Sequence, residues 1–539
     1  MALTVTLETL ALIKDFLDHR RTWDVSPESS ALLLACLEAI ETRGEPGAAV
    51  LLWPGIDPRP SPDQHRILEV MSSLLTAASA QQVISLIHAT GRMNQLWSQQ
   101  GNERWWNLSA SAVRSLAEDR PACTGLMVLL SGHRSGYVRE AALLGLDGVT
   151  APCVLPALPD RLNDWVEPVR RAAMRAMRGF LSAEQAATLV GSLDLLDGLR
   201  RCGRADHHAV LDQIDMVLRE PAARPAVQTG LSSPIPAIRR GCYSALLLGT
   251  HPDDWLEWGL QADDPWIQRH AAHALRQLPP DRVPAGSLDR MAACILRPVR
   301  QIAVEMMGDA GDILRLRGFL LDRSPTVREF ARFYLGKALG RFDAPAFYRD
   351  GLASVSEALL PRFLAGLGET GGSSDVPAIL PHTWHRRSAV RLSALRALAR
   401  LAPGDVTAPF LNALSDRSGR IRDMATAALA ARCSAVPIGR LTAWADTAVP
   451  AHRRCAVRLL AHYPTTTHLP VLLPFLSDAD EGVRILAETI CLRGLAQLLN
   501  PFLAPDPWQV WAERHCPTWS SGHRDRVLAL IRARARGRS

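Results

Sequence analysis

A short phrase that recurs along the chain constrains its fold more than any other feature. It reads as a branched aliphatic residue, arginine, two variable residues, a small residue and a small or apolar stretch. Copies that begin at 390, 421, 452 and 483 lie 31 residues apart. A fixed period of this length is typical of stacked repeat proteins, in which each repeat buries its apolar face against its neighbours. The clear copies begin at Val138, Val169, Ile238, Val299, Val327, Val390, Ile421 and Val483, and weaker copies begin at Ile267 and His452.

Two gaps between copies, 169 to 238 and 327 to 390, are about twice the usual length. Each predicts one degenerate copy. The first is expected within Asp206–Leu218 and the second from Leu359-Leu360, where LLPRFLAGLGETG aligns with VRQIAVEMMGDAG. With these two copies the chain holds about twelve units.

Each unit is predicted to be a helix, a tight turn and a second helix. Val327, Ala331 and Leu335 follow the spacing of one helix face, and the apolar segment GFLLD precedes them. Aspartate ends that first segment and small or turn-forming residues follow it. Such residues cap helices and turn the backbone.

This pattern resembles the HEAT repeat, in particular the short form of phycobilisome-lyase-type HEAT proteins, with the motif L-x-D-x-x-x-x-V-R-x-x-A. The resemblance covers about 120 to 500. It implies an all-α chain that forms a right-handed α-solenoid, or superhelix, of about twelve HEAT-like helix pairs with divergent terminal caps.

The resemblance also implies a ladder in which turn aspartates and helix arginines of neighbouring repeats bind one another, with the second helices on the concave face. Gln268 and Leu360 replace the arginine, so we expect the ladder to be interrupted there. The residues that the resemblance assigns to the ladder are Asp322, Arg328, Asp416, Arg422, Asp478 and Arg484.

The ends of the chain depart from the repeat. We predict a divergent helical N-terminal region or cap over 1–119, the repeat solenoid over 120–502, and a capping segment with a basic tail over 503–539. Terminal repeats of a solenoid need a changed outer face, because nothing stacks on them.

Composition bounds the environment of the protein. The ten cysteines include no C-x-x-C pair, which favours buried thiols in a reducing compartment, and no apolar run suits a bilayer. We therefore expect a cytoplasmic protein without membrane insertion. The net charge of +7 favours an acidic protein or nucleic acid as partner.

No common catalytic signature is found in the sequence. It lacks a glycine-rich phosphate loop, a G-x-S-x-G elbow and an H-E-x-x-H helix. Histidine and cysteine spacings do not converge on a metal site either. We predict no catalytic residues, no metal and no cofactor, and favour a non-catalytic protein over an enzyme.

Arginines follow the second helices at the positions two, six and nine after the aliphatic residue, which are expected to face the groove. They form basic sectors separated by acidic positions. The residues predicted to line a partner-binding groove are Arg171, Arg175, Arg178, Arg240, Arg269 and Arg276.

Two functions stay open from the sequence. The first is a scaffold or adaptor that binds a protein partner, acidic in character, along the concave face. The alternative is a DNA-binding or DNA-repair protein similar to HEAT-type alkylpurine DNA glycosylases, with Asp164-Trp165 and Asp254-Trp255 as the nearest matches to a lesion site. Bilin handling is suggested only by the name of the repeat subtype. The sequence leaves the oligomeric state open.

Overall fold

The computed structural model describes residues 5–22, 27–56, 62–90, 99–118, 122–249, 253–354, 356–402, 407–431, 436–443, 447, 449–463 and 471–498. Every regular element within these ranges is a helix, which confirms the all-α prediction. The chain divides into two compact units, Met1–Met291 and Ala292–Ser539. Each unit is a stack of helices in which successive pairs pack on one another, as expected of an α-solenoid.

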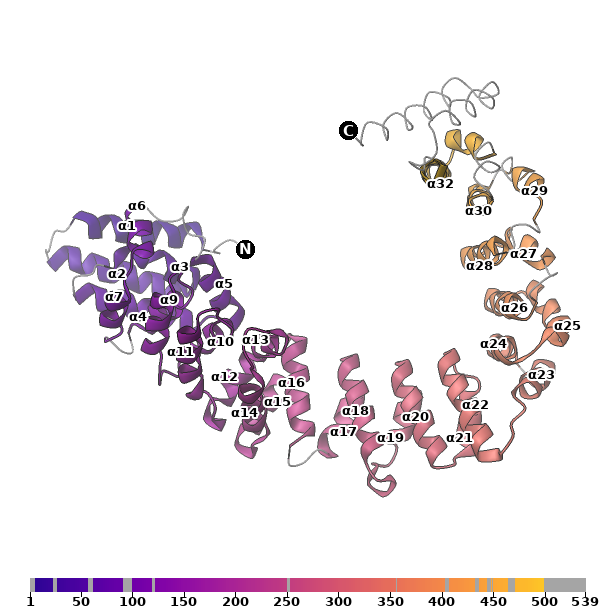
Figure 1. Cartoon of the computed structure of the whole chain (residues 1–539), viewed down its shortest axis with the longest axis horizontal. Helices are drawn as coiled ribbons and strands as arrows, with labels where there is room; N and C mark the ends of the chain where they lie inside the picture. The colour runs from indigo at the N-terminus through magenta and orange to yellow at the C-terminus, as the bar shows by residue number, and fades with distance from the viewer. Residues whose placement is uncertain are drawn as a thin grey trace. The chain divides into compact units, whose positions relative to one another are not determined.

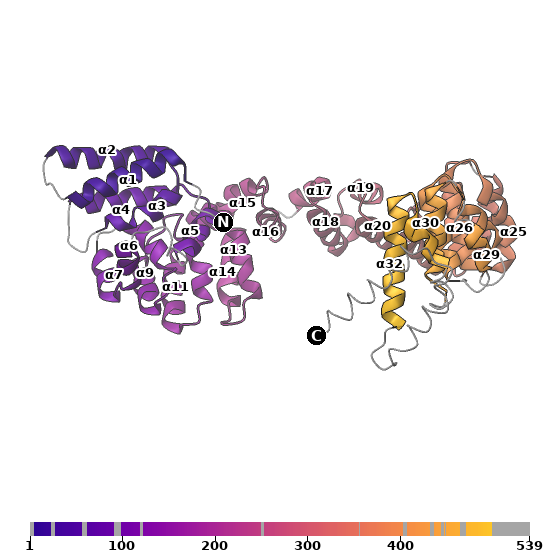
Figure 2. The same cartoon turned by 90° about the horizontal axis from the view of Figure 1, so that it is seen from above.

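The first unit begins with helices that precede the first copy of the phrase and continues with helix pairs. The early helices are α1 (Leu7–Thr22), α2 (Pro27–Arg43), α3 (Gly47–Leu51), α4 (Pro62–Thr76), α5 (Ala80–Thr90), α6 (Gln99–Trp106) and α7 (Ala110–Leu116). The pairs comprise α8 (Thr124–Leu130) with α9 (Gly136–Gly145), α10 (Leu158–Leu162) with α11 (Glu167–Arg178), α15 (Arg224–Gly230) with α16 (Pro236–Leu247), and α17 (Asp253–Gln261) with α18 (Pro265–Gln277). Between α11 and α15 lie α12 (Ala186–Gly191), α13 (Leu193–Gly198) and α14 (His208–Arg219). In both Figure 1 and Figure 2, α9, α11 and α14 follow one another along the stack.

The second unit continues the pattern after α19 (Ser287–Ala293), which spans the division. Its helices are α20 (Arg297–Asp309), α21 (Ile313–Phe319), α22 (Pro325–Leu339), α23 (Ala344–Ser354), α24 (Leu360–Thr370), α25 (Val376–Ile379), α26 (Ser388–Leu401), α27 (Ala408–Ala413), α28 (Gly419–Ala430), α29 (Ile438–Ala443), α30 (Pro450–Leu460) and α32 (Glu481–Leu498). Within this unit, α24, α26, α28 and α30 form one row and α23, α25, α27 and α29 the other (Figure 1). The second helices of the repeats therefore share one face of the unit.

The repeated phrase forms the core of both stacks. Its aliphatic residue lies in the first turns of each second helix and is at most 5% exposed in all nine aliphatic copies: Val138, Val169, Ile238, Ile267, Val299, Val327, Val390, Ile421 and Val483. Burial of such a side chain stabilises the fold by roughly 1.5–3 kcal/mol. The phrase recurs because each repeat buries the same position against the next.

Proline starts many of the second helices. It occupies the first or second position of α11, α16, α18, α20, α22 and α30. Its fixed φ suits the first turn of a helix, where its missing N–H would have no partner in any case. The turn therefore ends abruptly and the second helix begins at a defined residue.

Both degenerate copies are helices, as predicted. The first is α14, which buries Val210, Leu211 and Ile214, and the second is α24. The predicted capping segment over 503–539 lies outside the described residues. The boundaries at 119 and 502 stay predictions.

Candidate functional site

Repeats that carry the phrase arginine tie the turn to the second helix through this one side chain. The phrase arginine donates through Nη1 to the backbone carbonyl of the residue six positions earlier, at distances from 2.5 Å for Arg328 and Asp322 to 2.9 Å for Arg139 and His133. Turn carbonyls lack a helical partner, so this bond fixes the entry of the chain into the second helix. The same bond joins Arg170 to Asp164, Arg239 to Ser233, Arg300 to Cys294, Arg391 to His385, Arg422 to Asp416, Arg453 to Thr447 and Arg484 to Asp478.

Turn aspartates link this arginine to the neighbouring repeat. Each carboxylate accepts two hydrogen bonds from an arginine of the preceding repeat and one from the backbone N–H two residues later. Bidentate, charge-assisted pairs of this kind are among the stronger hydrogen bonds in proteins. The pairs are Arg300 with Asp322, Arg391 with Asp416 and Arg453 with Asp478, all at 2.7 to 2.9 Å, and the N–H donors are Ser324, Ser418 and Asp480.

The arginines predicted for the ladder make a different contact from the one expected. Arg422 and Arg484 donate to the carbonyls of Asp416 and Asp478, so each binds its own turn and not that carboxylate. The carboxylates are bound by the arginines one repeat earlier, which belong to copies of the phrase but were not among the residues predicted for the ladder. A spacing of 22 or 25 residues between arginine and aspartate is the signal that finds them.

The most buried link joins the two earliest pairs. The side chains of Arg139 and Asp164 are 4% and 2% exposed. Their two hydrogen bonds measure 2.8 and 2.9 Å, Arg161 adds a third at 3.1 Å, and the Val166 N–H a fourth at 3.0 Å. Asp164 is therefore fully occupied inside the protein, although Trp165 beside it is 75% exposed.

At the two expected interruptions the contacts differ from the regular pattern, and a link between neighbouring repeats is seen at the second one. Gln268 keeps the bond to its turn, because its side-chain amide donates to the Ala262 carbonyl at 2.6 Å. Where Leu360 removes the arginine, Arg328 of the preceding repeat binds Glu369 on α24. Arg332 donates to the same carboxylate at 3.0 Å. A glutamate nine residues into the helix thus replaces the turn aspartate, which the sequence motif could not reveal.

Histidine replaces aspartate in one buried turn. His133 accepts the Ser135 N–H on Nδ1 at 3.1 Å, and its Nε2 lies 2.9 Å from the Trp105 carbonyl. Since Nδ1 accepts, the proton belongs on Nε2 and the ring is neutral. Burial lowers the pKa of His133 from its usual value, and the cations of Arg134 and Arg139 also lower it.

The predicted groove arginines fall into two exposed groups and one paired residue. Arg171, Arg175 and Arg178 are exposed along α11, and we call these three the basic stripe. Within the part of the chain that the structure describes, only Arg171 of the three shows an ion pair, with Glu167 on its own helix. Arg269 and Arg276 are exposed on α18.

Arg240 differs from the other predicted groove residues. It is held by Asp264, with 3.0 Å between Nε and the carboxylate. Its guanidinium also lies 5.9 Å from the ring centre of Trp266. The structure therefore assigns Arg240 a fixed position between α16 and α18, separate from the basic stripe.

A hollow of about 710 Å³ lies among α13, α14 and α16 in the first unit, and we call it the α14 pocket. Apolar side chains dominate its lining, and its volume lies within the usual range of binding pockets. It occurs where the first degenerate copy stacks, so the regular motif gave no signal for it. Its apolar lining includes Leu193, Leu196, Leu211, Ile214 and Leu218.

The described residues offer little for metal or thiol chemistry. No group of three or more histidine, cysteine, aspartate or glutamate side chains among them could hold a metal ion. Burial raises the pKa of Cys242 to about 12, and raises that of Cys491, which lies near Glu488, to about 12. Both thiols therefore stay protonated and unreactive near neutral pH. None of the helices in these ranges is both long and apolar enough to cross a membrane.

Several solved structures resemble the chain at low sequence identity. No protein-family model and no curated protein matches the chain. Among solved structures, an engineered protein is 15% identical over 77% of this chain and 98% of its own, with a TM-score of 0.20. A chain from the structure of Kap95p with RanGDP is 12% identical over 96% of this chain and 67% of its own, with a TM-score of 0.31. Importin beta is 15% identical over 89% of this chain and 61% of its own, with a TM-score of 0.28. With identities and TM-scores this low, none of these likenesses carries an argument about what this chain does, and the phycobilisome-lyase-type resemblance stays a prediction.

Proposed function

We propose that this protein is a non-catalytic scaffold that binds an acidic protein partner through the basic stripe of the first unit. The observation that carries the proposal is the exposure of Arg171, Arg175 and Arg178 on one helix. Some other exposed arginines of this unit are paired with carboxylates of neighbouring helices, for example Arg282 with Asp253 at 2.8 Å. Cations without such partners are free to bind a partner's carboxylates and to steer its approach.

The position of the stripe supports this reading. The three arginines are spaced so that they lie on one side of α11, while Val169, Ala172, Ala173, Ala176 and Met177 bury the other side. A helix anchored on its apolar face holds its charged face in a fixed orientation. Because the guanidinium fork binds carboxylates bidentately, such a face favours an acidic surface over a neutral one.

Charge reversal tests the proposal directly. The variant Arg171→Glu/Arg175→Glu/Arg178→Glu is compared with the wild-type chain by affinity capture from the native cell, followed by partner identification and measurement of the affinity for each purified partner. We expect a loss of affinity of at least about tenfold, since each charged contact contributes roughly 1 kcal/mol or more. Unchanged affinity in a folded triple variant would overturn the proposal.

A matched control distinguishes the loss of the basic stripe from the effect of a changed net charge. The variant Arg104→Glu/Arg114→Glu/Arg282→Glu changes three exposed arginines of the same unit by the same total charge. It should bind the partner about as well as the wild-type chain. A DNA duplex is titrated in parallel at low salt. Duplex binding that falls steeply with added salt, and that only the basic-stripe variant abolishes, would favour the nucleic-acid function instead.

A further inference from the structure

The α14 pocket exists because the repeat there is irregular. In place of a single first helix, the chain forms α12 and α13 and then a loop before α14. On the opposite wall, α16 presents small residues, Ala237, Gly241, Ser244 and Ala245. A Cβ added to Gly241 would lie 3.2 Å from a methyl carbon of Leu193, so the two walls meet closely there. Small side chains on one wall and leucines on the other leave an apolar hollow.

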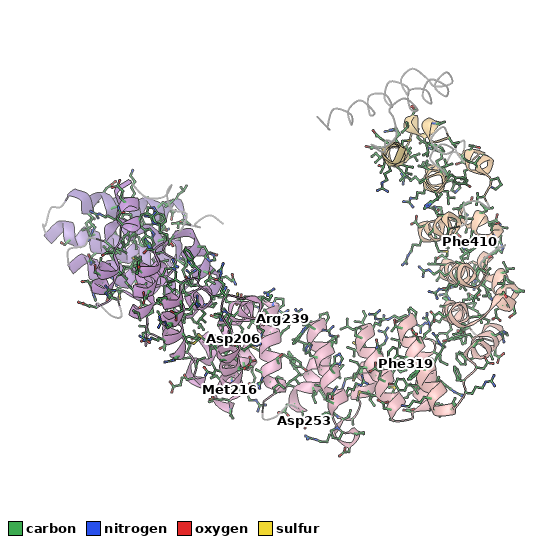
Figure 3. The ribbon with its side chains drawn as sticks, viewed as in Figure 1. Asp206, Met216, Arg239, Asp253, Phe319 and Phe410 are labelled. Atoms are coloured by element: carbon green, nitrogen blue, oxygen red, sulfur yellow. The ribbon has the colours of Figure 1, made fainter. Side chains whose placement is uncertain are left out.

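Two walls of the hollow are formed by α14 and α16. Asp206, just before α14, and Arg239, in the first turn of α16, lie toward one end of the pair, and Met216 lies toward the other (Figure 3). Met216 and Leu248, near the ends of these helices, are 58% and 62% exposed. Leu248 itself lines the pocket, so the apolar lining reaches the protein surface at this residue.

One arginine that lines the pocket has a hydrogen-bond donor without an acceptor. Arg200 is bound by Asp197 and Asp215, each at 3.2 Å. Arg219, in the last turn of α14, also lines the pocket, and its Nε is buried without a hydrogen-bond partner. Arg219 as a whole is partly exposed, so a ligand's carboxylate can bind its guanidinium without competing with a carboxylate among the residues that the structure describes.

We propose that the α14 pocket receives an apolar side chain of a partner segment, and that a carboxylate beside this side chain binds Arg219. The inference rests on the proposed function and names the chemistry of the partner: an acidic amphipathic helix. Leucine-sized side chains fit a hollow lined by leucine and isoleucine, and the anion complements the unpaired guanidinium. Helix-in-groove recognition of this kind uses anchors at i, i+3, i+4 and i+7.

Defined peptides are the probes. The first is a short helical peptide with leucine at the anchor positions and glutamate between them. The second replaces each leucine with alanine, and the third replaces each glutamate with lysine. Binding to the full-length chain is measured by fluorescence anisotropy. We expect only the first peptide to bind tightly, because only it offers both the apolar anchors and the carboxylates.

Three variants test the site. Arg219→Gln removes the charge and the Nε donor, and should weaken the first peptide about tenfold. Ser244→Leu fills the hollow from α16, where Ser244 is partly exposed, and should weaken the peptide at least as much. Arg317→Gln, an exposed arginine on α21, is the matched control and should leave the affinity unchanged. Thermal unfolding checks that each variant folds.

Several outcomes would overturn the inference. These are no measurable binding of the first peptide, equal binding of the alanine peptide, or equal affinity for Arg219→Gln, Ser244→Leu and the wild-type chain. Self-association of the chain that Ser244→Leu abolishes would assign the pocket to a second copy and would also overturn it. Failure of the proposed function is a separate result, because the partner's affinity would then be unchanged by charge reversal on α11.

Discussion

Replacing Asp164 with alanine should destabilise the first unit more than the equivalent change in any other described turn. The substitution leaves the Arg139 guanidinium 4% exposed and without its carboxylate. Breaking a buried pair by removing one partner costs about 3–5 kcal/mol, because an uncompensated charge stays buried. The loss of the hydrogen bond to the Val166 N–H adds roughly 1 kcal/mol. The expected total is about 4–6 kcal/mol.

Asp416→Ala provides the comparison within the same fold. The Arg391 and Asp416 side chains make the same two hydrogen bonds but are 18% and 10% exposed. Water can solvate the arginine that remains, so the cost should fall to about 2 kcal/mol, between the values for exposed and buried pairs. Asp164→Asn, which keeps the shape and an acceptor for Val166, should lie between wild type and Asp164→Ala.

Native-state hydrogen exchange is the suitable assay, since repeat proteins unfold in parts and a single unfolding midpoint averages over them. Exchange of backbone amides in α9 and α11 reports the local free energy of opening for the Asp164 variants, and exchange in α26 and α28 reports it for Asp416→Ala. A cost for Asp164→Ala below about 1 kcal/mol, or no larger than that of Asp416→Ala, would refute the link between burial and the strength of the ladder.

Two further predictions concern the packing of single residues. The pKa of His133 is lowered in the folded protein, so the unfolded chain takes up a proton first as the pH falls, and stability should decrease below about pH 6.5. Hydrogen exchange of the Ser135 amide at about pH 7.5 and about pH 5.5 checks this. An equally steep loss of stability in the His133→Asn variant would contradict it. Gly308→Ala should destabilise the second unit by about 1–3 kcal/mol, because its Cβ would lie 2.1 Å from a ring carbon of Tyr334. Gly336→Ala, which meets no atom within 4 Å, should be neutral or stabilising by up to about 1 kcal/mol, and equal midpoints in urea for the two glycine variants would refute the packing argument.

The sequence predicted the features that repeat and missed those that do not. Burial of Val327 and Ile421 follows from helical spacing, since one position per repeat faces the neighbouring pair. The link from Arg328 to Glu369 spans 41 residues and ends within a helix, so the motif offers no register for it. The α14 pocket arises where the motif fails, and its shape depends on how α13 packs against α16. Arg240 was expected to face a partner, but Asp264 lies two residues beyond the usual turn position and binds it.

The bond from each arginine to its own turn carbonyl has a consequence for how such a chain can change in length. It is made wholly within one repeat and involves only a backbone acceptor, so Ser233, Cys294 and Thr447 serve as well as aspartate. A repeat with this arginine therefore fixes the turn between its own two helices, whatever the sequence of the neighbouring repeat. Gain or loss of a whole repeat changes only one interface between neighbouring repeats. Duplication or deletion of whole repeats can therefore lengthen or shorten this protein with little disturbance to the repeats that remain.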